Sequence, residues 1–149
     1  MRIVIALFAA AGFLLAEPNL SGTWKLNHEK SDFGRAPRPG SVVTKIRQQG
    51  GELAAQSNSD GRVNEYRWTL DGKESVNRIG GNEVRAVAAW RGPILQVRSK
   101  TTVQGTALAM TDQYSLSADG REMTIFRTIN GPQGEIEQRY VYDKDLSDK

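Results

Sequence analysis

The 149-residue sequence contains no cysteine and a single histidine, His28. Without cysteine the chain forms no disulfide, so its core and its hydrogen bonds must hold the fold together. The same shortage leaves no Cys/His cluster for zinc and no evident partner for a Ser-His-acid arrangement. Haem ligation by His28 is disfavoured as well, because this residue lies in a Pro/Gly-rich stretch. We therefore expect no metal, no cofactor and no enzymatic activity.

Strong charge asymmetry and later apolar runs are also missing. The 20 Lys and Arg residues exceed the 17 Asp and Glu residues only slightly, and the two signs are interspersed rather than clustered along the chain. No basic cluster marks a nucleic-acid surface. After residue 16 there is no apolar run long enough for a membrane-spanning helix. The sequence thus predicts neither a nucleic-acid partner nor a membrane span.

The N-terminal segment MRIVIALFAAAGFLLA has one arginine, then an apolar run with several small residues. This pattern is typical of a secretory signal peptide, and the run is short for a membrane span. We expect cleavage after Ala16, which makes residues 1–16 the signal and residues 17–149 a single domain. The predicted protein is exported, to the periplasm or the medium, and monomeric.

Helical periodicity is absent too, and short alternating runs separated by Gly-containing turns take its place. Such turns join adjacent antiparallel strands. A meander of many strands must hide its edges, and closure into a barrel does so. The sequence therefore predicts an all-β fold, an antiparallel up-and-down β-barrel of about ten strands. The candidate turns are Gly50-Gly51, Asp60-Gly61, Asp71-Gly72, Gly80-Gly81, Arg91-Gly92, Gln104-Gly105, Asp119-Gly120 and the longer segment 130–134.

A two-residue turn also fixes which residues lie opposite each other, and the pairing keeps the apolar residues on one face throughout. The Asp119-Gly120 turn sets Asp112 opposite Arg127, so that an acid and a base share the inward face. Three further pairings follow from the remaining turns: Leu95 opposite Tyr114, Ala88 opposite Leu95, and Trp68 opposite Ser75.

The first strand, LSGTWKL at residues 20–26, resembles the Gly-x-Trp strand that opens lipocalins. It is closer to the Gly-Thr-Trp-Lys-Leu opening of intracellular fatty-acid-binding proteins. The chain is most similar to small exported lipocalin-like (calycin-type) proteins of bacteria, through SGTWKLN at 21–27 and EKSDFG at 29–34. The resemblance implies a ten-stranded barrel more than a particular function.

The sequence departs from fatty-acid-binding proteins in two places. Their two-helix lid follows the first strand, whereas here the connection 27–41 contains Pro37 and Pro39, so we expect no helical lid. Their last strand carries an Arg-x-Tyr pair that holds the ligand carboxylate. Here Tyr142 matches that Tyr and Tyr140 stands in place of the Arg, which leaves Arg127 as the one clear inward cation.

The predicted inward face is too polar for a dry core, because buried polar groups need partners. An apolar wall with a few converging polar groups is typical of a small-ligand pocket. The connection 27–41 is expected to pack over one end of this barrel through Phe33. The candidate ligand-binding residues are Tyr66, Trp68, Asn77, Asp112, Tyr114, Arg127, Gln138, Tyr140 and Tyr142.

Two interpretations of the Asp112–Arg127 pair stay open. It is either a structural pair, or a site where Arg127 meets a ligand anion while Asp112 aligns the guanidinium. The predicted function is binding of a small, partly apolar ligand, with an anionic group as one option. One alternative is an interaction or inhibitor barrel that binds a protein through its loops. Another is a cofactor-free isomerase or cyclase that uses Asp112 and interior tyrosines.

Overall fold

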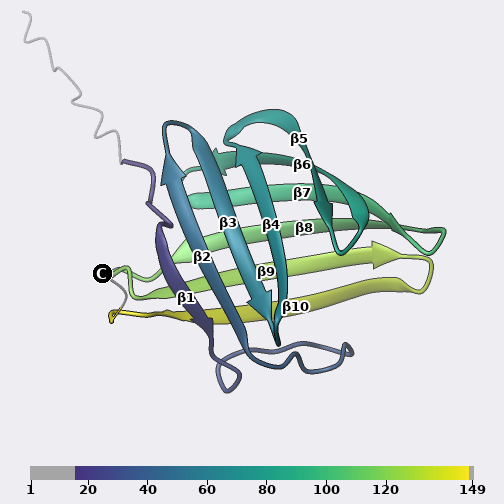
Figure 1. Ribbon diagram of the computed structural model, residues 1–149, viewed down its shortest axis with the longest axis horizontal. Helices are drawn as coiled ribbons and strands as arrows, with labels where there is room; N and C mark the ends of the chain where they lie inside the picture. The colour runs from purple at the N-terminus through teal and green to yellow at the C-terminus, as the bar shows by residue number, and fades with distance from the viewer. Residues whose placement is uncertain (1–15, 148–149) are drawn as a thin grey trace, which may run out of the picture.

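The computed structural model describes residues 16–147 and consists of ten antiparallel strands with no helix among those residues. The predicted signal segment, apart from Ala16, lies outside this range. Figure 1 labels the strands in chain order. Their bounds are β1 Gly22–Leu26, β2 Val42–Gln49, β3 Glu52–Ser59, β4 Arg62–Thr69, β5 Asp71–Ile79, β6 Asn82–Arg91, β7 Ile94–Val103, β8 Thr106–Leu116, β9 Glu122–Gly131 and β10 Gly134–Lys144.

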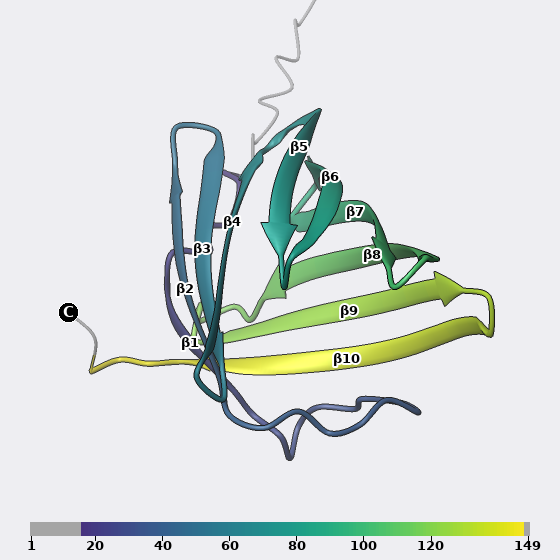
Figure 2. The same ribbon diagram turned by 45° about the vertical axis from the view of Figure 1, so that its right-hand side comes forward.

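The strands form one sheet in the order β4-β3-β2-β1-β10-β9-β8-β7-β6-β5. Strands adjacent in sequence are therefore neighbours, and the first strand pairs with the last, as Leu26 opposite Tyr142 illustrates. In Figures 1 and 2 the strands β1–β4 cross β6–β10 steeply and enclose a common interior. The prediction of an antiparallel barrel of about ten strands is confirmed.

Most predicted hairpin registers are confirmed, including Asp112 opposite Arg127 and Leu95 opposite Tyr114. The β6–β7 register is wrong by two residues, because Ala88 lies opposite Val97 rather than Leu95. The reason is that Arg91 stays in the ladder opposite Ile94, so residues 92–93 form the turn. A two-residue shift preserves the inward face, since side chains alternate with a period of two.

The predicted β4–β5 hairpin with Trp68 opposite Ser75 is also wrong. β4 and β5 are the two ends of the sheet in the described chain. Asp71, expected in the turn, instead begins β5 and pairs with Ala89 of β6. The backbone of Leu70 still bonds to Gly51, on the β3 side. The chain thus changes partner strands within one residue, which leaves a seam between β4 and β5.

Side chains cross this seam where backbone bonds do not. The Asn77 amide donates to the Arg67 carbonyl oxygen and accepts from the Arg67 N–H, both at 2.9 Å. The Ser75 hydroxyl oxygen accepts from the N–H of Thr69 at 3.1 Å. These bonds satisfy backbone groups of β4 that would otherwise face an unpaired edge.

The packed core lies toward one end of the barrel. The largest fully buried side chains are Trp24, Leu20, Leu53, Leu95 and Met123, and Leu53, Leu95 and Met123 lie near the starts of β3, β7 and β9. The Trp24 indole N–H donates to the Leu20 carbonyl at 2.9 Å, so this aromatic ring is buried with its polar group satisfied. The other part of the interior is left for a cavity.

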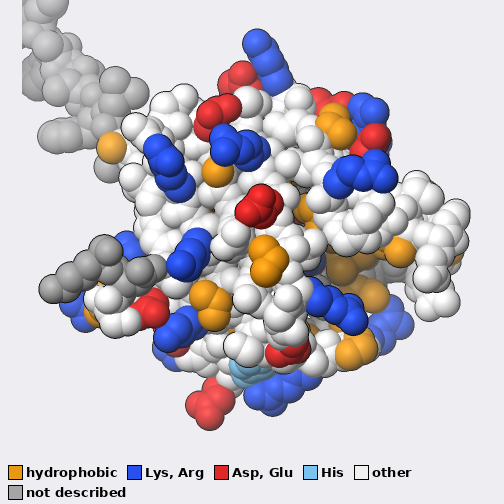
Figure 3. All heavy atoms as spheres, viewed as in Figure 1, with side chains coloured by type: hydrophobic (Ala, Val, Ile, Leu, Met, Phe, Trp, Pro, Cys, Tyr) orange, Lys and Arg blue, Asp and Glu red, His pale blue; other side chains and the backbone are white. Residues whose placement is uncertain are grey.

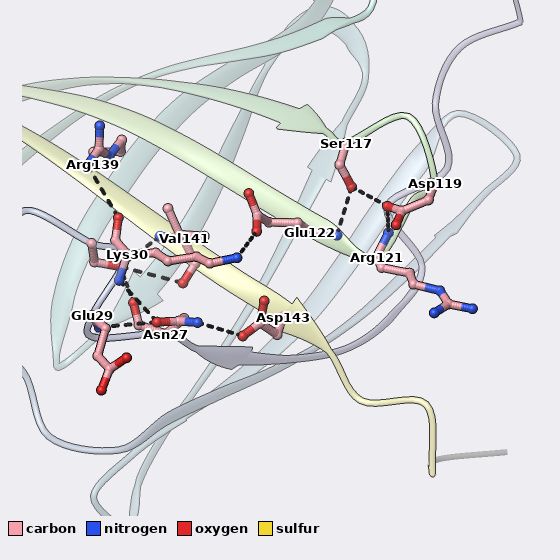
Figure 4. A network of polar contacts seen from close by, with 11 residues as sticks. Asn27, Glu29, Lys30, Ser117, Asp119, Arg121, Glu122, Arg139, Val141 and Asp143 are labelled. Atoms are coloured by element: carbon pink, nitrogen blue, oxygen red, sulfur yellow. Dashed lines mark hydrogen bonds and ion pairs between the residues drawn. The ribbon is translucent and has the colours of Figure 1, made fainter.

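The connection 27–41 follows the edge of β10, below it in Figure 2. Asp32 makes an isolated antiparallel bridge with Arg139 of β10. Figure 4 shows further ties at the start of the connection, where Lys30 pairs with Glu122 at 2.8 Å and Asn27 donates to Asp143. Phe33 is buried, with 9% of its surface exposed, as predicted, whereas packing of the segment over one end of the barrel stays a prediction.

Candidate functional site

The barrel encloses a cavity of about 480 Å³, within the usual range for small-ligand pockets. Lining residues such as Ser59, Asn82 and Val103 stand beside the β3–β4, β5–β6 and β7–β8 turns, so the cavity reaches that end of the barrel. Figure 3 shows hydrophobic side chains gathered in a recess on the right of the molecule, with Lys and Arg side chains around it. The packed core closes the opposite end.

Asp112 and Arg127 lie side by side on β8 and β9 and form a bidentate ion pair inside the cavity. Arg127 donates from Nε to Oδ1 at 2.8 Å and from the Nη2 amine to Oδ2 at 2.9 Å. The Asp112 side chain is 8% exposed and the Arg127 side chain 28% exposed. Burial alone would lower the pKa of Arg127, but the Asp112 carboxylate raises it, so the guanidinium stays charged.

Tyr140 supports the guanidinium from one side, with the Arg127 Cζ 5.2 Å from its ring centroid. The Tyr140 hydroxyl donates to Gln138 Oε1 at 3.1 Å, and Gln138 Nε2 donates to the Phe33 carbonyl at 3.1 Å. The Phe33 ring meets the Tyr140 ring edge-on at 5.3 Å. These contacts connect the 27–41 segment to the ion pair without a break.

Three aromatic rings line the wall beside the pair. The Tyr66 and Trp68 centroids are 4.9 Å apart, and those of Trp68 and Tyr114 are 5.9 Å apart. Burial raises the pKa of Tyr66 to about 12, against the opposing charge of Arg127. Burial likewise raises the pKa values of Tyr114 and Tyr142 well above the ordinary value, so all three hydroxyls are neutral at physiological pH.

Several hydrogen-bond donors near the ion pair have no protein partner among residues 16–147. Arg127 has five N–H groups, of which Asp112 accepts two. The hydroxyls of Tyr66, Tyr114 and Tyr142 make no hydrogen bond in this part of the chain, and they are not sealed from the cavity. The arrangement is therefore able to donate several hydrogen bonds to one polar group of a ligand.

Seven of the nine predicted site residues line the cavity, namely Tyr66, Trp68, Asp112, Tyr114, Arg127, Tyr140 and Tyr142. Two do not. Asn77 bridges the seam, where Arg67 takes up its donor and its acceptor, and Gln138 is buried between Tyr140 and Phe33. Sequence reasoning did not find Pro39, which lines the cavity from the irregular 27–41 connection, where no alternation indicates an inward face.

Within residues 16–147, no three His, Asp or Glu side chains lie close enough together to form a metal site. No helix in that part of the chain is long and apolar enough to span a membrane.

The chain is similar in fold to several proteins of known structure. The zebrafish ileal bile acid-binding protein, complexed with cholic acid, aligns with a TM-score of 0.65 and 18% identity, over 85% of this chain and 98% of that one. Lipid binding protein 8 of Caenorhabditis elegans, without ligand, aligns with a TM-score of 0.61 and 13% identity, over 85% and 95%. A secretory abundant heat soluble protein from Ramazzottius varieornatus aligns with a TM-score of 0.62 and 14% identity, over 84% and 94%.

No protein-family model matches the sequence, and no curated protein matches it at the sequence level. At these identities the structural likeness defines the fold. The chain folds as a ten-stranded antiparallel barrel like those of the bile acid-binding protein and lipid binding protein 8.

Proposed function

We propose that this protein binds a small, partly apolar ligand inside its barrel. The observation that carries the proposal is the 480 Å³ cavity, which is apolar over most of its wall. Donors of Arg127 and of three tyrosines face this cavity without a partner among residues 16–147. Buried polar groups need partners, and a ligand's polar group supplies them. The named structural neighbours that bind lipids or bile acids support this proposal.

The ligand's apolar part is proposed to lie toward the mouth. Ile79, Val84, Val103, Leu108 and Met110 line that side. Its polar part is proposed to lie beside Arg127. This position suits either a carboxylate, as the sequence suggested, or a neutral acceptor. The 27–41 connection is proposed to limit access to the cavity, which the lining position of Pro39 and the burial of Phe33 support.

Binding is favoured over isomerase or cyclase chemistry. Both carboxylate oxygens of Asp112 accept hydrogen bonds from Arg127, so this acid would have to leave the guanidinium before it took a proton. A general base needs a lone pair within reach of the substrate. The raised pKa values of Tyr66 and Tyr114 also keep these hydroxyls from acting as bases near neutral pH.

Native mass spectrometry of the protein purified from its host without denaturation tests the binding proposal. We expect a mass increment from a co-purified small amphiphile that disappears after delipidation, and renewed binding of fatty-acid probes to the delipidated protein. Absence of any increment, together with no binding of fatty acid, ester or alcohol probes, would contradict the proposal. Recovery of a stoichiometric protein partner instead would favour the interaction-barrel alternative.

Export is proposed separately, from the N-terminal segment alone. An arginine followed by an apolar run and small residues is what a secretory signal requires. Mass spectrometry of the protein from the periplasm or medium should find a chain that begins at Glu17. Recovery of a chain that still begins with Met1, in the cytoplasmic fraction, would contradict this proposal.

A further inference from the structure

The two charges in the cavity wall cancel. Among the described residues that line the cavity, only Asp112 and Arg127 carry a full charge at neutral pH. They neutralise each other through two hydrogen bonds of 2.8 and 2.9 Å. The other polar lining groups are hydroxyls and amides. A neutral interior is a poor host for a further ion, because burial of an uncompensated charge is costly.

The part of the cavity around Arg127 nevertheless contains hydrogen-bond donors without a partner among residues 16–147. Asp112 occupies one edge of the guanidinium, and the remaining N–H groups of Arg127 have no partner in residues 16–147. Tyr66, Tyr114 and Tyr142 add hydroxyls that stay protonated, since burial raises their pKa values. A neutral acceptor can take up these hydrogen bonds without adding an uncompensated charge to the buried site.

Building on the proposed function, we propose that the ligand's polar group is a neutral hydrogen-bond acceptor, such as the carbonyl of an ester or a ketone. Arg127 and the tyrosines hold this carbonyl while Asp112 keeps the site neutral. A carboxylate in the same place would share the guanidinium with Asp112, and two carboxylates in one site do not both stay ionised. A fatty acid therefore binds in its protonated form, which presents a carbonyl again.

The test compares a fatty acid, its methyl ester and the alcohol of the same chain length as competitors of a neutral fluorescent dye. At mildly alkaline pH we expect the ester to bind at least about tenfold more tightly than the acid. The ionised acid would bring its carboxylate close to that of Asp112, and close like charges are strongly unfavourable. The affinity of the acid should fall as pH rises, whereas that of the ester should stay constant.

The decisive variant is Asp112→Asn, which keeps the size of the side chain and removes its charge. We expect it to bind the acid about tenfold more tightly than the wild type does, since the guanidinium is now uncompensated. The ratio of acid affinity to ester affinity should therefore rise relative to the wild type. Glu65→Gln is the matched control, because Glu65 is an exposed residue of β4 that bonds to Gln56, outside the cavity lining.

Each outcome separates this inference from the proposed function. If none of the three probes displaces the dye, both fall. If the wild type binds the ionised acid as tightly as the ester, with no pH dependence and no gain in Asp112→Asn, the inference falls and binding stands. Should Asp112→Asn fail to fold, ¹³C NMR of carboxyl-labelled acid bound to the wild type decides. A protonated-acid shift supports the inference and a carboxylate shift overturns it.

Discussion

At the scale of single residues, the Asp112–Arg127 pair couples stability to binding. Asp112→Leu or Arg127→Met leaves one buried charge without its partner, and each should cost about 3–5 kcal/mol of unfolding free energy. The double substitution removes both charges and should cost less than the sum of the two single changes. Urea denaturation of the four proteins measures this coupling. Single substitutions that each cost less than about 1 kcal/mol, and whose costs add in the double variant, would mean that the ion pair is solvated and weak.

Tyrosine ionisation gives a second prediction at this scale. The folded-state pKa of Tyr66 is raised to about 12 from 10.0, chiefly by burial. Between these values the unfolded chain loses the proton while the folded chain keeps it, so stability should fall as pH rises through this window. Tyr66→Phe should flatten part of the decline, and Tyr114 and Tyr142 account for the rest. A titration followed by tyrosinate absorbance should show late ionisation; ionisation of all four tyrosines near pH 10.0 would contradict it.

At the scale of elements, the seam between β4 and β5 depends on the side chain of Asn77. Asn77→Ala removes two hydrogen bonds to Arg67 and should cost about 1–2 kcal/mol. Amide exchange should accelerate at Arg67, whose N–H loses its acceptor. Val76→Ala, at a neighbouring residue that is 52% exposed, is the control. Unchanged exchange at Arg67 in Asn77→Ala would show that the seam is held by other contacts.

A second prediction at this scale concerns the connection 27–41. The Phe33 ring packs on Tyr140, and the Phe33 carbonyl accepts a hydrogen bond from Gln138. Phe33→Ala should cost about 3 kcal/mol, near the low end for a buried phenylalanine, since a loop relaxes more easily than a strand. Faster association and dissociation of a fluorescent ligand should accompany the loss, as measured by stopped flow. Unchanged ligand kinetics in a destabilised variant would restrict Phe33 to a structural role.

Sequence patterns predict the strands, their inward faces and most hairpin registers, because these depend on local alternation. They do not predict the change of partner strand between β4 and β5, which depends on how the barrel closes. The Asp119-Gly120 turn fixes Asp112 opposite Arg127, and this pairing is confirmed. The Asp71-Gly72 pair is a hairpin signal in sequence, yet Asp71 pairs with Ala89 of β6, so the change of partner strand could not be predicted from the turn residues. Alternation alone predicts Asn77 as a lining residue, because it identifies the inward face but not the neighbouring strand; in the structure Asn77 bonds to Arg67 across the seam.

At the scale of the whole molecule, the barrel divides its interior between a packed end and a cavity. Trp24, Leu53 and Leu95 close one end, and the 480 Å³ cavity occupies the other. A ligand that binds only the folded state should raise the melting temperature by mass action, with about 2.7 kcal/mol of added stability at a hundredfold excess over Kd. Calorimetry with increasing ester concentration measures this gain. A melting temperature that is independent of concentration would contradict interior binding.

The most direct test of interior binding is a titration of ¹⁵N-labelled, delipidated protein with a fatty-acid methyl ester, followed by NMR. We expect the largest shift changes at inward-facing residues of β4, β8, β9 and β10, led by Tyr66, Tyr114 and Arg127. Outward-facing residues of the same strands, such as Gln113 and Phe126, should change less. Changes confined to outward-facing residues, or none at saturating ester, would contradict a ligand inside the barrel.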